Sequence, residues 1–439
     1  MAEQMMQDAA GKAIPVGYKQ TEVGVIPEDW EIKTLGELVD IYSGESPSKF
    51  NFTESGIPYF KVEQLNDGLM YADETPYFID TQKTVRAGSV IFPKRGASIL
   101  LNKIRLLKRD SFMDTNLMAL TCSFSLDALY LYNRLIYKKL SSVADTTSIP
   151  QINNKHITPY AIPFPTKQEQ TAIANVLSDS DALIDALEQL IAKKQAIKSA
   201  TMQQLLTGRT RLPAFALRPD GTPKGYKPSE LGEIPEDWEA ASLGSLLKET
   251  PRYGINAPAV PLTGDTPVYI RITDISDDGY FNPGEKVGVN SPFSGMYFLS
   301  AGDIVLARTG ASVGKSYLYN KNDGQLVYAG FLIKVSPNQE RLSSMFLSQY
   351  LKSHRYWNWV VVNSMRSGQP GINGSEYASL LIPTPTIEEQ TAIATILSDM
   401  DNELQVLTQK LEKARALKQG MMQQLLTGKI RLIKRENHD

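Results

Sequence analysis

The sequence predicts an α+β protein in which two globular domains and two long, paired helices form an internal repeat. Three observations carry this prediction: a duplicated set of motifs, strand-like segments between them, and two long amphipathic segments free of proline. The duplicated motifs are "GYKQTEVGVIPEDWE" (17–31) with "GYKPSELGEIPEDWE" (225–239), "IPFPTKQEQTAIANVLSDSD" (162–181) with "IPTPTIEEQTAIATILSDMD" (382–401), and "MQQLLTGRTRL" (202–212) with "MQQLLTGKIRL" (422–432). Self-similarity of this kind indicates a duplicated architecture.

The composition is that of an ordinary globular protein. The chain has 439 residues, with 42% hydrophobic and 21% charged, enough for two to four domains. Its net charge of −2 argues against a protein that coats polyanions without selectivity. The single cysteine, Cys122, excludes internal disulfides and cysteine-cluster metal sites. Because no apolar run is long enough to cross a membrane and no signal peptide is evident, we expect a cytoplasmic protein with no metal and no membrane partner.

We predict one globular domain in residues 1–161 and a second in residues 211–381, each opened by a copy of the IPEDWE motif. Short β-branched and aromatic runs bounded by Gly, Asp and Asn indicate strands and turns. Segments 128–140 and 343–361 have the apolar spacing of helices. The two domains are therefore expected to share a scaffold while most of their other residues differ.

Start and stop signals delimit two long helical segments, residues 162–210 and 382–439. At each start a threonine precedes a glutamate by three positions, the capping-box pattern that satisfies backbone amides of the first turn. Each end carries a glycine suited to a left-handed cap. These residues are Thr166, Glu169 and Gly208 in the first copy, and Thr386, Glu389 and Gly428 in the second. Each segment is long enough for roughly 60 Å of helix, and Gly420 is a potential weak point in the second.

Both long segments carry an apolar stripe that needs a partner. Alternating spacings of three and four residues, as in a heptad seam, mark the second stripe. Its residues are Leu397, Met400, Leu404, Leu407, Leu411 and Ala414. A similar line in the first segment is Val176, Leu183, Leu187, Leu190 and Ile197, interrupted by Ser180 and Lys194. A helix of this length cannot bury its stripe against itself, so we predict that the two helices pair within the chain.

The order of these segments resembles the specificity subunits of Type I restriction-modification enzymes. The strongest carriers are the duplicated "IPEDWE", the duplicated "EQTAIA" (169–174 and 389–394) and "MQQLLTG", and the resemblance covers residues 17–432. It implies that the two globular segments are target recognition domains, each reading one part of a split DNA sequence. It also implies that the long helices form an antiparallel coiled coil separating those domains, with pseudo-two-fold symmetry.

The resemblance further implies a set of partners and a division of labour. The chain would bind double-stranded DNA and two methyltransferase subunits, and restriction subunits would join through these. S-adenosylmethionine, and ATP with magnesium, would belong to the partner subunits. No nucleophile–base pair is suggested by spacing, and no N-P-P-[FY] string of adenine methyltransferases is present. We therefore expect a non-catalytic chain without a cofactor of its own.

Two other functions remain open at this point. One is the recognition subunit of a combined cleavage-methylation enzyme of the Type IIB kind. The other is a coiled-coil scaffold that joins two proteins without binding DNA. The stretch "RTGASVGKS" (308–316) does not support a nucleotide-hydrolysing site, because only three residues separate its glycines where a phosphate-binding loop needs four.

Polar and basic side chains in the predicted turns are the candidates for DNA contact. Arginine and amide groups suit base edges, and lysine and hydroxyl groups suit phosphates. In the first domain the candidates are Ser46, Ser48, Lys49, Lys94, Arg95 and Gln151. In the second they are Arg252, Tyr253, Asn256, Arg308, Lys315, Arg366 and Gln369. Ordinary surface charge or a turn-forming role is the alternative for each.

The repeated IPEDWE motif lies outside the variable segments, so we predict that it serves a partner protein and not DNA. The candidate partner-binding residues are Trp30 and Glu28 in the first copy and Trp238 and Glu236 in the second. Acidic side chains suit a protein surface better than one facing phosphates. For the tryptophans, packing of the domain base against the helices is favoured over base stacking.

Overall fold

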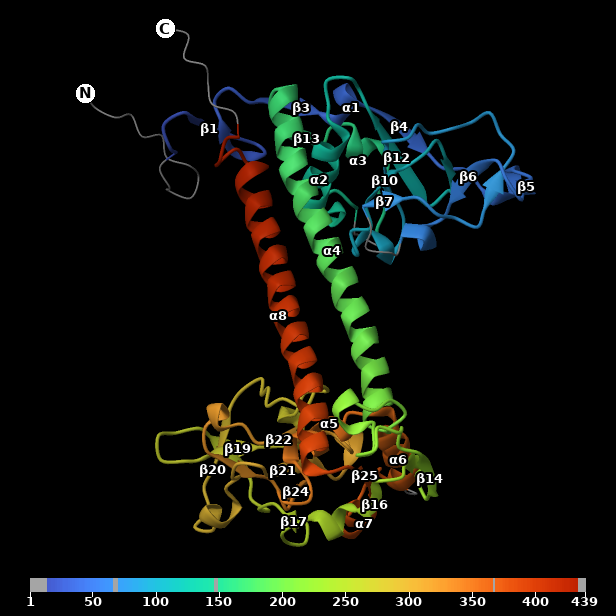
Figure 1. The fold of residues 1–439 in the computed structure, drawn as a ribbon. Coiled ribbons are helices and arrows are strands. Elements are labelled where there is room, and N and C mark those ends of the chain that lie inside the picture. Colours follow the sequence, from blue (N-terminus) through green and yellow to red (C-terminus); the bar gives the residue numbers. More distant parts are fainter. Residues whose placement is uncertain (1–13, 66–69, 146–148, 366–367, 433–439) are drawn as a thin grey trace. The chain divides into compact units, whose positions relative to one another are not determined.

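The computed structural model describes residues 14–65, 70–145, 149–365 and 368–432 (Figure 1). The chain divides into two compact units, one made of Met1–Glu188 with Gln409–Asp439 and the other of Gln189–Thr408. We call them unit 1 and unit 2. Each unit thus combines one globular domain with a part of both long helices, α4 (Lys167–Leu205) and α8 (Ile387–Leu425).

Unit 1 contains two small sheets that pack with three helices. The strand order is β4-β12-β9-β10-β7 in one sheet and β11-β6-β8-β5 in the other; the hairpin β1-β2 and the pair β13-β3 stand apart. The strands are β1 (Tyr18–Thr21), β2 (Gly24–Pro27), β3 (Glu31–Thr34), β4 (Val39–Ser43), β5 (Phe52–Thr53), β6 (Ile57–Phe60), β7 (Tyr71–Ala72), β8 (Phe78–Ile79), β9 (Val90–Pro93), β10 (Arg105–Leu107), β11 (Phe112–Met113), β12 (Leu117–Cys122) and β13 (Ala161–Phe164). The helices are α1 (Leu35–Leu38), α2 (Ala128–Lys138) and α3 (Asn154–Ile157).

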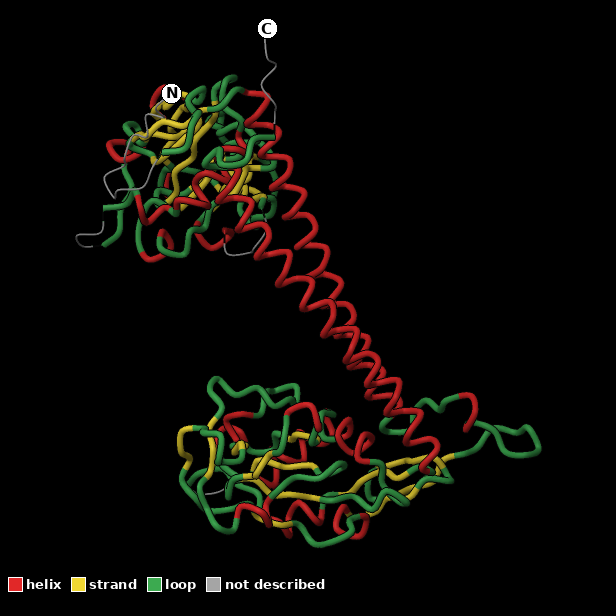
Figure 2. Tube along the Cα trace, turned by 90° about the vertical axis from the view of Figure 1, so that its left-hand side faces the viewer, coloured by secondary structure: helices red, strands yellow, loops and turns green. Residues whose placement is uncertain are grey.

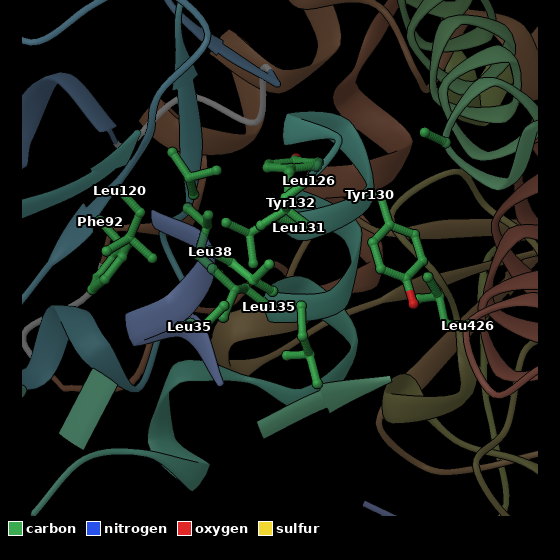
Figure 3. Close-up of a cluster of buried hydrophobic side chains, with 14 of the residues drawn as sticks. Leu35, Leu38, Phe92, Leu120, Leu126, Tyr130, Leu131, Tyr132, Leu135 and Leu426 are labelled. Atoms are coloured by element: carbon green, nitrogen blue, oxygen red, sulfur yellow. The ribbon is translucent and has the colours of Figure 1, made fainter. Parts of the chain in front are cut away.

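The core of unit 1 forms where α2 packs on the larger sheet. Asp127 caps α2 by accepting hydrogen bonds from the backbone N–H groups of the first turn. Leu131 and Leu135 of α2 meet Leu120 of β12 and Phe92 of β9 in one buried cluster (Figure 3). The helical spacing of these residues is what the sequence predicted for 128–140.

Unit 2 repeats this plan. Its sheets have the orders β17-β24-β21-β22 and β18-β20-β19-β23, beside the hairpin β14-β15 and the pair β16-β25. The strands are β14 (Tyr226–Ser229), β15 (Gly232–Pro235), β16 (Glu239–Ser242), β17 (Arg252–Tyr253), β18 (Ala259–Pro261), β19 (Val268–Ile270), β20 (Val287–Val289), β21 (Ile304–Ala307), β22 (Ser316–Leu318), β23 (Leu326–Tyr328), β24 (Leu332–Val335) and β25 (Leu381–Thr384). The helices are α5 (Ser344–Tyr350), α6 (His354–Ser364) and α7 (Gly374–Ser379).

One helical segment of unit 2 differs from its prediction. The sequence predicts helical structure throughout 343–361, but the helix breaks after Tyr350 and α6 begins at His354. Ser353 starts the new helix by accepting a hydrogen bond from Tyr356 N at 3.3 Å. A serine side chain competes for backbone amides in this way, so it favours a cap over a helix interior.

The long helices run antiparallel in both units, as predicted (Figures 1 and 2). In unit 1 the ion pairs Asp181–Lys418 and Glu188–Arg415 join them. In unit 2 the pairs are Lys198–Asp401 and Lys194–Glu403. Rising residue numbers on α4 meet falling numbers on α8 in each case. Both helices are 39 residues long, and α8 continues through Gly420.

The predicted stripe on the first helix is partly wrong. Leu183 is 55% exposed, Leu190 37% and Ile197 42%. The less exposed line is Leu177, Ile184, Leu187, Ile191 and Lys198. Spacing alone favoured an all-apolar line, whereas the actual contact face includes charged residues that are neutralised across the helix pair. On α8 the predicted positions Leu397, Leu407 and Leu411 are buried.

A buried cluster of charged and aromatic side chains, which we call the clasp, ties the helix ends to the repeated motif. In unit 1, Glu169 of α4 accepts a hydrogen bond from Trp30 Nε1 at 3.0 Å. Arg431, just beyond α8, donates to the same carboxylate at 2.6 and 2.8 Å and to Asp29 at 2.9 Å. Glu169 and Trp30 are each only 1% exposed. The clasp therefore joins the start of one long helix, the end of the other and the IPEDWE motif.

Unit 2 contains the same clasp. Trp238 Nε1 donates to Glu389 at 3.0 Å, and Arg211 binds that carboxylate at 2.7 Å and Asp237 at 2.7 Å. Burial opposes the charge of Asp237, but hydrogen bonds from Arg211 and Lys224 outweigh it and lower the pKa of Asp237 to about 2. Duplication of the sequence has thus duplicated an ionic network around a buried glutamate.

The clasp bears on two predictions. Trp30 and Trp238 are each 1% exposed, which agrees with the predicted packing of the domain base against the helices and leaves almost none of their surface to bind a partner. The predicted capping box is only half formed. Thr166 accepts from Glu169 N at 3.3 Å and Thr386 from Glu389 N at 3.4 Å, but both carboxylates turn to the clasp. The reason is that an indole N–H and a guanidinium compete for them.

The glycines that end the long helices also belong to the clasp. Gly208 has φ +72° and Gly428 φ +70°, the left-handed conformation predicted for a cap. A Cβ on Gly428 would lie 2.4 Å from Pro27 Cδ, and one on Gly208 would lie 2.5 Å from Pro235 Cδ. The proline of the repeated motif therefore packs so closely against the glycine that a side chain at the glycine would clash with it.

We predict that Arg431→Ala lowers the free energy of unfolding by about 3–5 kcal/mol, because it leaves the buried Glu169 carboxylate without its cation. Chemical denaturation of the chain measures this. The matched control is Arg415→Ala, which breaks an exposed ion pair with Glu188 and should change the free energy of unfolding far less. Equal losses in the two variants would contradict a structural role for the clasp.

Candidate nucleic-acid interface

In each unit, strand ends and loops from distant parts of the sequence meet at one edge of the larger sheet. In unit 1, β4 and β9 end at the edge where β12 begins, because β12 runs antiparallel to both. In unit 2, β17 and β21 end where β24 begins for the same reason. We call each of these the reading edge of its unit, because it carries residues that the sequence predicts to contact DNA.

The reading edge of unit 1 brings together three predicted residues. Arg95 and Gln151 form an isolated antiparallel bridge. Ile152 N donates to Lys94 O at 2.9 Å, which fixes Lys94 beside the same loop. Burial lowers the pKa of the Lys94 ammonium, and the neighbouring Arg95 charge lowers it further. Two cations and an amide thus lie side by side although 57 positions separate the outermost two in the chain.

The polar turn after β4 joins this edge. Gly44 N donates to Leu117 O at 3.2 Å, which places the turn beside β12. Ser46 accepts from Ser48 N at 3.3 Å and caps a short 3₁₀ turn that includes Lys49. Lys49 pairs with Glu45 at 3.2 Å, and Lys83 pairs with the same carboxylate at 2.6 Å. Lys83, an exposed cation, is a residue that sequence reasoning missed, since no motif marks it.

The reading edge of unit 2 has the same backbone connections. Ile372 N donates to Arg308 O at 2.9 Å, and Gly310 N to Pro370 O at 3.0 Å. In unit 1 the corresponding bonds are Ile152 N to Lys94 O and Gly96 N to Pro150 O, both at 2.9 Å. The scaffold is therefore shared down to individual hydrogen bonds, while the side chains that it presents differ.

Three predicted residues of unit 2 line one groove of about 720 Å³: Tyr253, Asn256 and Arg308. The Arg308 guanidinium lies 4.9 Å from the centre of the Tyr253 ring. Asn256 is exposed. Phe331, which sequence reasoning missed, also lines the groove and is 58% exposed. A lone phenylalanine in a strand-like run carries no signal of exposure, so only the structure identifies it.

The remaining candidates of unit 2 do not line this groove. Arg252 pairs with Glu249 at 2.6 Å and Lys315 with Asp277 at 2.7 Å. Gln369 is exposed, and its amide lies where a Cβ on Gly310 would point. Arg366 lies outside the described residues. The glycines of "RTGASVGKS" serve a tight turn between β21 and β22, which agrees with the rejection of a phosphate-binding loop.

Two buried glutamines connect the globular domains to the long helices. Gln170 accepts from Asp127 N at 2.8 Å, and Gln390 accepts from Ser343 N at 2.8 Å. Both are fully buried. They follow the clasp glutamates in the duplicated "EQTAIA" motif, so the motif anchors each domain helix as well as each clasp. In the sequence, the repetition of this motif is the only sign that Gln170 and Gln390 matter, and it does not indicate what they bind.

Two acidic candidates of the repeated motif remain at the surface. Glu28 is exposed, and Glu236 is partly exposed beside Arg218, which binds it at 2.7 Å. Within the described residues, no group of three or more His, Cys, Asp or Glu side chains is arranged to hold a metal ion. None of the described helices is long and apolar enough to cross a membrane.

Comparison with known proteins extends these observations. A family profile described as "Type I restriction modification DNA specificity domain" matches residues 27–198 and 235–416. The chain is 26% identical over 428 residues to the Type I restriction enzyme MjaVIII specificity subunit of Methanocaldococcus jannaschii, covering 93% of this chain and 94% of that protein. It is 21% identical over 441 residues to the EcoDI specificity subunit of Escherichia coli, covering 92% and 88%.

A solved structure shares the fold. The S subunit of a Type I restriction-modification system from M. genitalium matches with a TM-score of 0.58 at 17% identity, covering 90% of this chain and 96% of that one. The family profile matches twice, once in each repeat. The chain therefore belongs to the Type I restriction-modification DNA specificity family, as a specificity subunit that leaves catalysis to the other subunits.

Proposed function

We propose that this subunit reads a split, asymmetric duplex DNA site, with one half read by each reading edge. The observation that carries the proposal is the shared edge with different side chains. Where unit 1 presents Lys94, unit 2 presents Arg308 through the same backbone hydrogen bonds. A common scaffold with different donors suits two different base sequences, because base identity is read by the donor and acceptor pattern of individual side chains.

The repeated segments suit a partner that is itself present twice. We propose that they recruit two methyltransferase subunits, and that Glu28 and Glu236 lie at the contact. Those subunits would bind S-adenosylmethionine and methylate adenines flipped out of the duplex. Restriction subunits that use ATP and magnesium would join through them, and the complex would act in the cytoplasm. The nearly neutral charge of this chain fits a complex in which partners share the neutralisation of phosphates.

The family match favours this proposal over the two alternatives. A recognition subunit of a combined cleavage-methylation enzyme would be encoded beside a fused gene, whereas separate restriction and methylation genes accompany a Type I system. A scaffold without DNA would bind no duplex selectively, with or without its partners, between 50 and about 200 mM salt.

The first test is methylome sequencing of cells with and without this gene. We expect a split methylation motif, with two different specified halves and an unspecified spacer, that disappears when the gene is deleted. Reintroduction of the gene should restore the same motif. If deletion removes no split motif, the proposed function is wrong.

The second test concerns the long helices. Inserting seven residues between Glu188 and Gln189 in α4, and seven between Thr408 and Gln409 in α8, adds about 10 Å of helix. Because duplex DNA rises about 3.4 Å per base pair, we expect a spacer longer by about three base pairs, with both half-sites unchanged. Methylome sequencing of the variant measures this. Altered half-site bases with the original spacer would contradict the idea that the helices set the separation.

A further inference from the structure

Arg308 in unit 2 is a cation without an acidic partner among the described residues. Its Nε is buried and has no hydrogen-bond partner there. Leaving a buried donor unsatisfied is unfavourable, more so when the donor is charged. The buried Nε is out of reach of a ligand, but the two terminal nitrogens also have no hydrogen-bond partner among the described residues. They can both donate to a ligand with two adjacent acceptors.

The guanidinium is held in place before any ligand arrives. It lies over the Tyr253 ring, and the Tyr253 hydroxyl accepts a hydrogen bond from Gly374 N at 3.0 Å, which fixes that ring. The backbone of Arg308 is fixed as well, since its N–H donates to Phe331 O at 3.0 Å. Stacking on an aromatic face orients a guanidinium and reduces the entropy lost on binding.

The groove around Arg308 has the chemistry of a base-binding surface. Its walls include the aromatic rings of Tyr253, Tyr269 and Phe331. A second arginine there, Arg271, is already engaged, because it binds Asp274 at 2.8 and 2.9 Å. Of the two arginines in the groove, Arg308 is thus the one whose hydrogen-bond donors are not bound to a carboxylate of the described residues. Aromatic walls favour a flat base over a hydrated phosphate.

We propose that Arg308 reads a guanine in the DNA half-site of unit 2, donating to guanine O6 and N7. Guanine is the base that presents two acceptors side by side in the major groove, and a bidentate arginine is its commonest partner. Tyr253 acts as the positioning residue that orients the guanidinium. Phe331 covers the contact from the rim of the groove. This inference rests on the proposed function and deepens it by naming a base and the residue that reads it.

The test uses the complete complex with its methyltransferase subunits and duplex oligonucleotides that carry the methylome-derived motif. Each guanine of the motif is replaced in turn by 7-deazaguanine, which lacks the N7 acceptor, or by hypoxanthine, which keeps O6 and N7. We expect one guanine at which 7-deazaguanine weakens binding roughly 5- to 150-fold, whereas hypoxanthine at that position retains it. Its location then assigns that half-site to unit 2.

Substitution of the arginine provides the second arm. Arg308→Ala and Arg308→Lys should each weaken binding to the natural motif by a similar factor and relax the methylome motif at that one guanine. In Arg308→Ala, 7-deazaguanine should cause no further loss, because the contact is already absent. Tyr253→Phe keeps the ring and removes only the hydroxyl, so it should cause a smaller loss at the same position.

Arg252→Ala is the matched comparison, because Arg252 is an exposed arginine on the same edge, paired with Glu249. We expect it to weaken binding to all duplexes alike. If Arg308→Ala behaves like Arg252→Ala, weakening all sequences uniformly and reducing the salt dependence by about one phosphate contact, then Arg308 binds phosphate and the inference is wrong. A motif whose halves contain no guanine would also overturn it.

Failure of this inference is distinguishable from failure of the proposed function. If deletion of the gene abolishes a split motif but no guanine responds to 7-deazaguanine, only the inference fails. If no motif depends on the gene, the function fails. Assembly of each variant with the methyltransferase subunits, and its unfolding midpoint, separate loss of contact from loss of fold.

Discussion

The structure depends on one buried carboxylate at the start of each long helix. Glu169 and Glu389 each gather an indole N–H and a guanidinium in a site that excludes water. A buried charge is tolerated only when it is paired and hydrogen-bonded. Because the guanidinium comes from beyond the end of the other helix, neither helix can be anchored without its partner. Antiparallel pairing is therefore a requirement of the charge balance as well as of the apolar seam.

The clasp explains why the repeated motif keeps both its tryptophan and its acidic residue. Trp30 donates a hydrogen bond to the buried Glu169, and Asp29 accepts hydrogen bonds from the partly buried Arg431, so each is constrained by a partner from another part of the chain. The motif also has a side at the surface, where Glu28 is exposed and Glu236 pairs with Arg218.

The two reading edges present different side chains on a shared scaffold. Backbone hydrogen bonds hold the strand ends in equivalent positions, so the side chain at each position varies without disturbing the fold. Lys94 and Arg308 occupy one such position, with different donor geometry. The groove beside Arg308 is lined by residues of unit 2 that include Tyr253, Tyr269 and Phe331. At this position the two units therefore differ in the side chain and share the backbone hydrogen bonds.

The sequence by itself determined the repeat, the α+β class, and the pair of long helices with their glycine ends. Duplication, hydrophobic spacing and turn residues are local features, so they can be recognised from the sequence. The tertiary structure alone decided that the Trp30 indole binds Glu169, that Leu183 faces away from the helix pair, and that Phe331 is exposed. Those outcomes depend on which distant charged group or strand lies opposite, such as Arg431 beside Trp30. The spacing of residues along the chain does not indicate which distant residues come into contact.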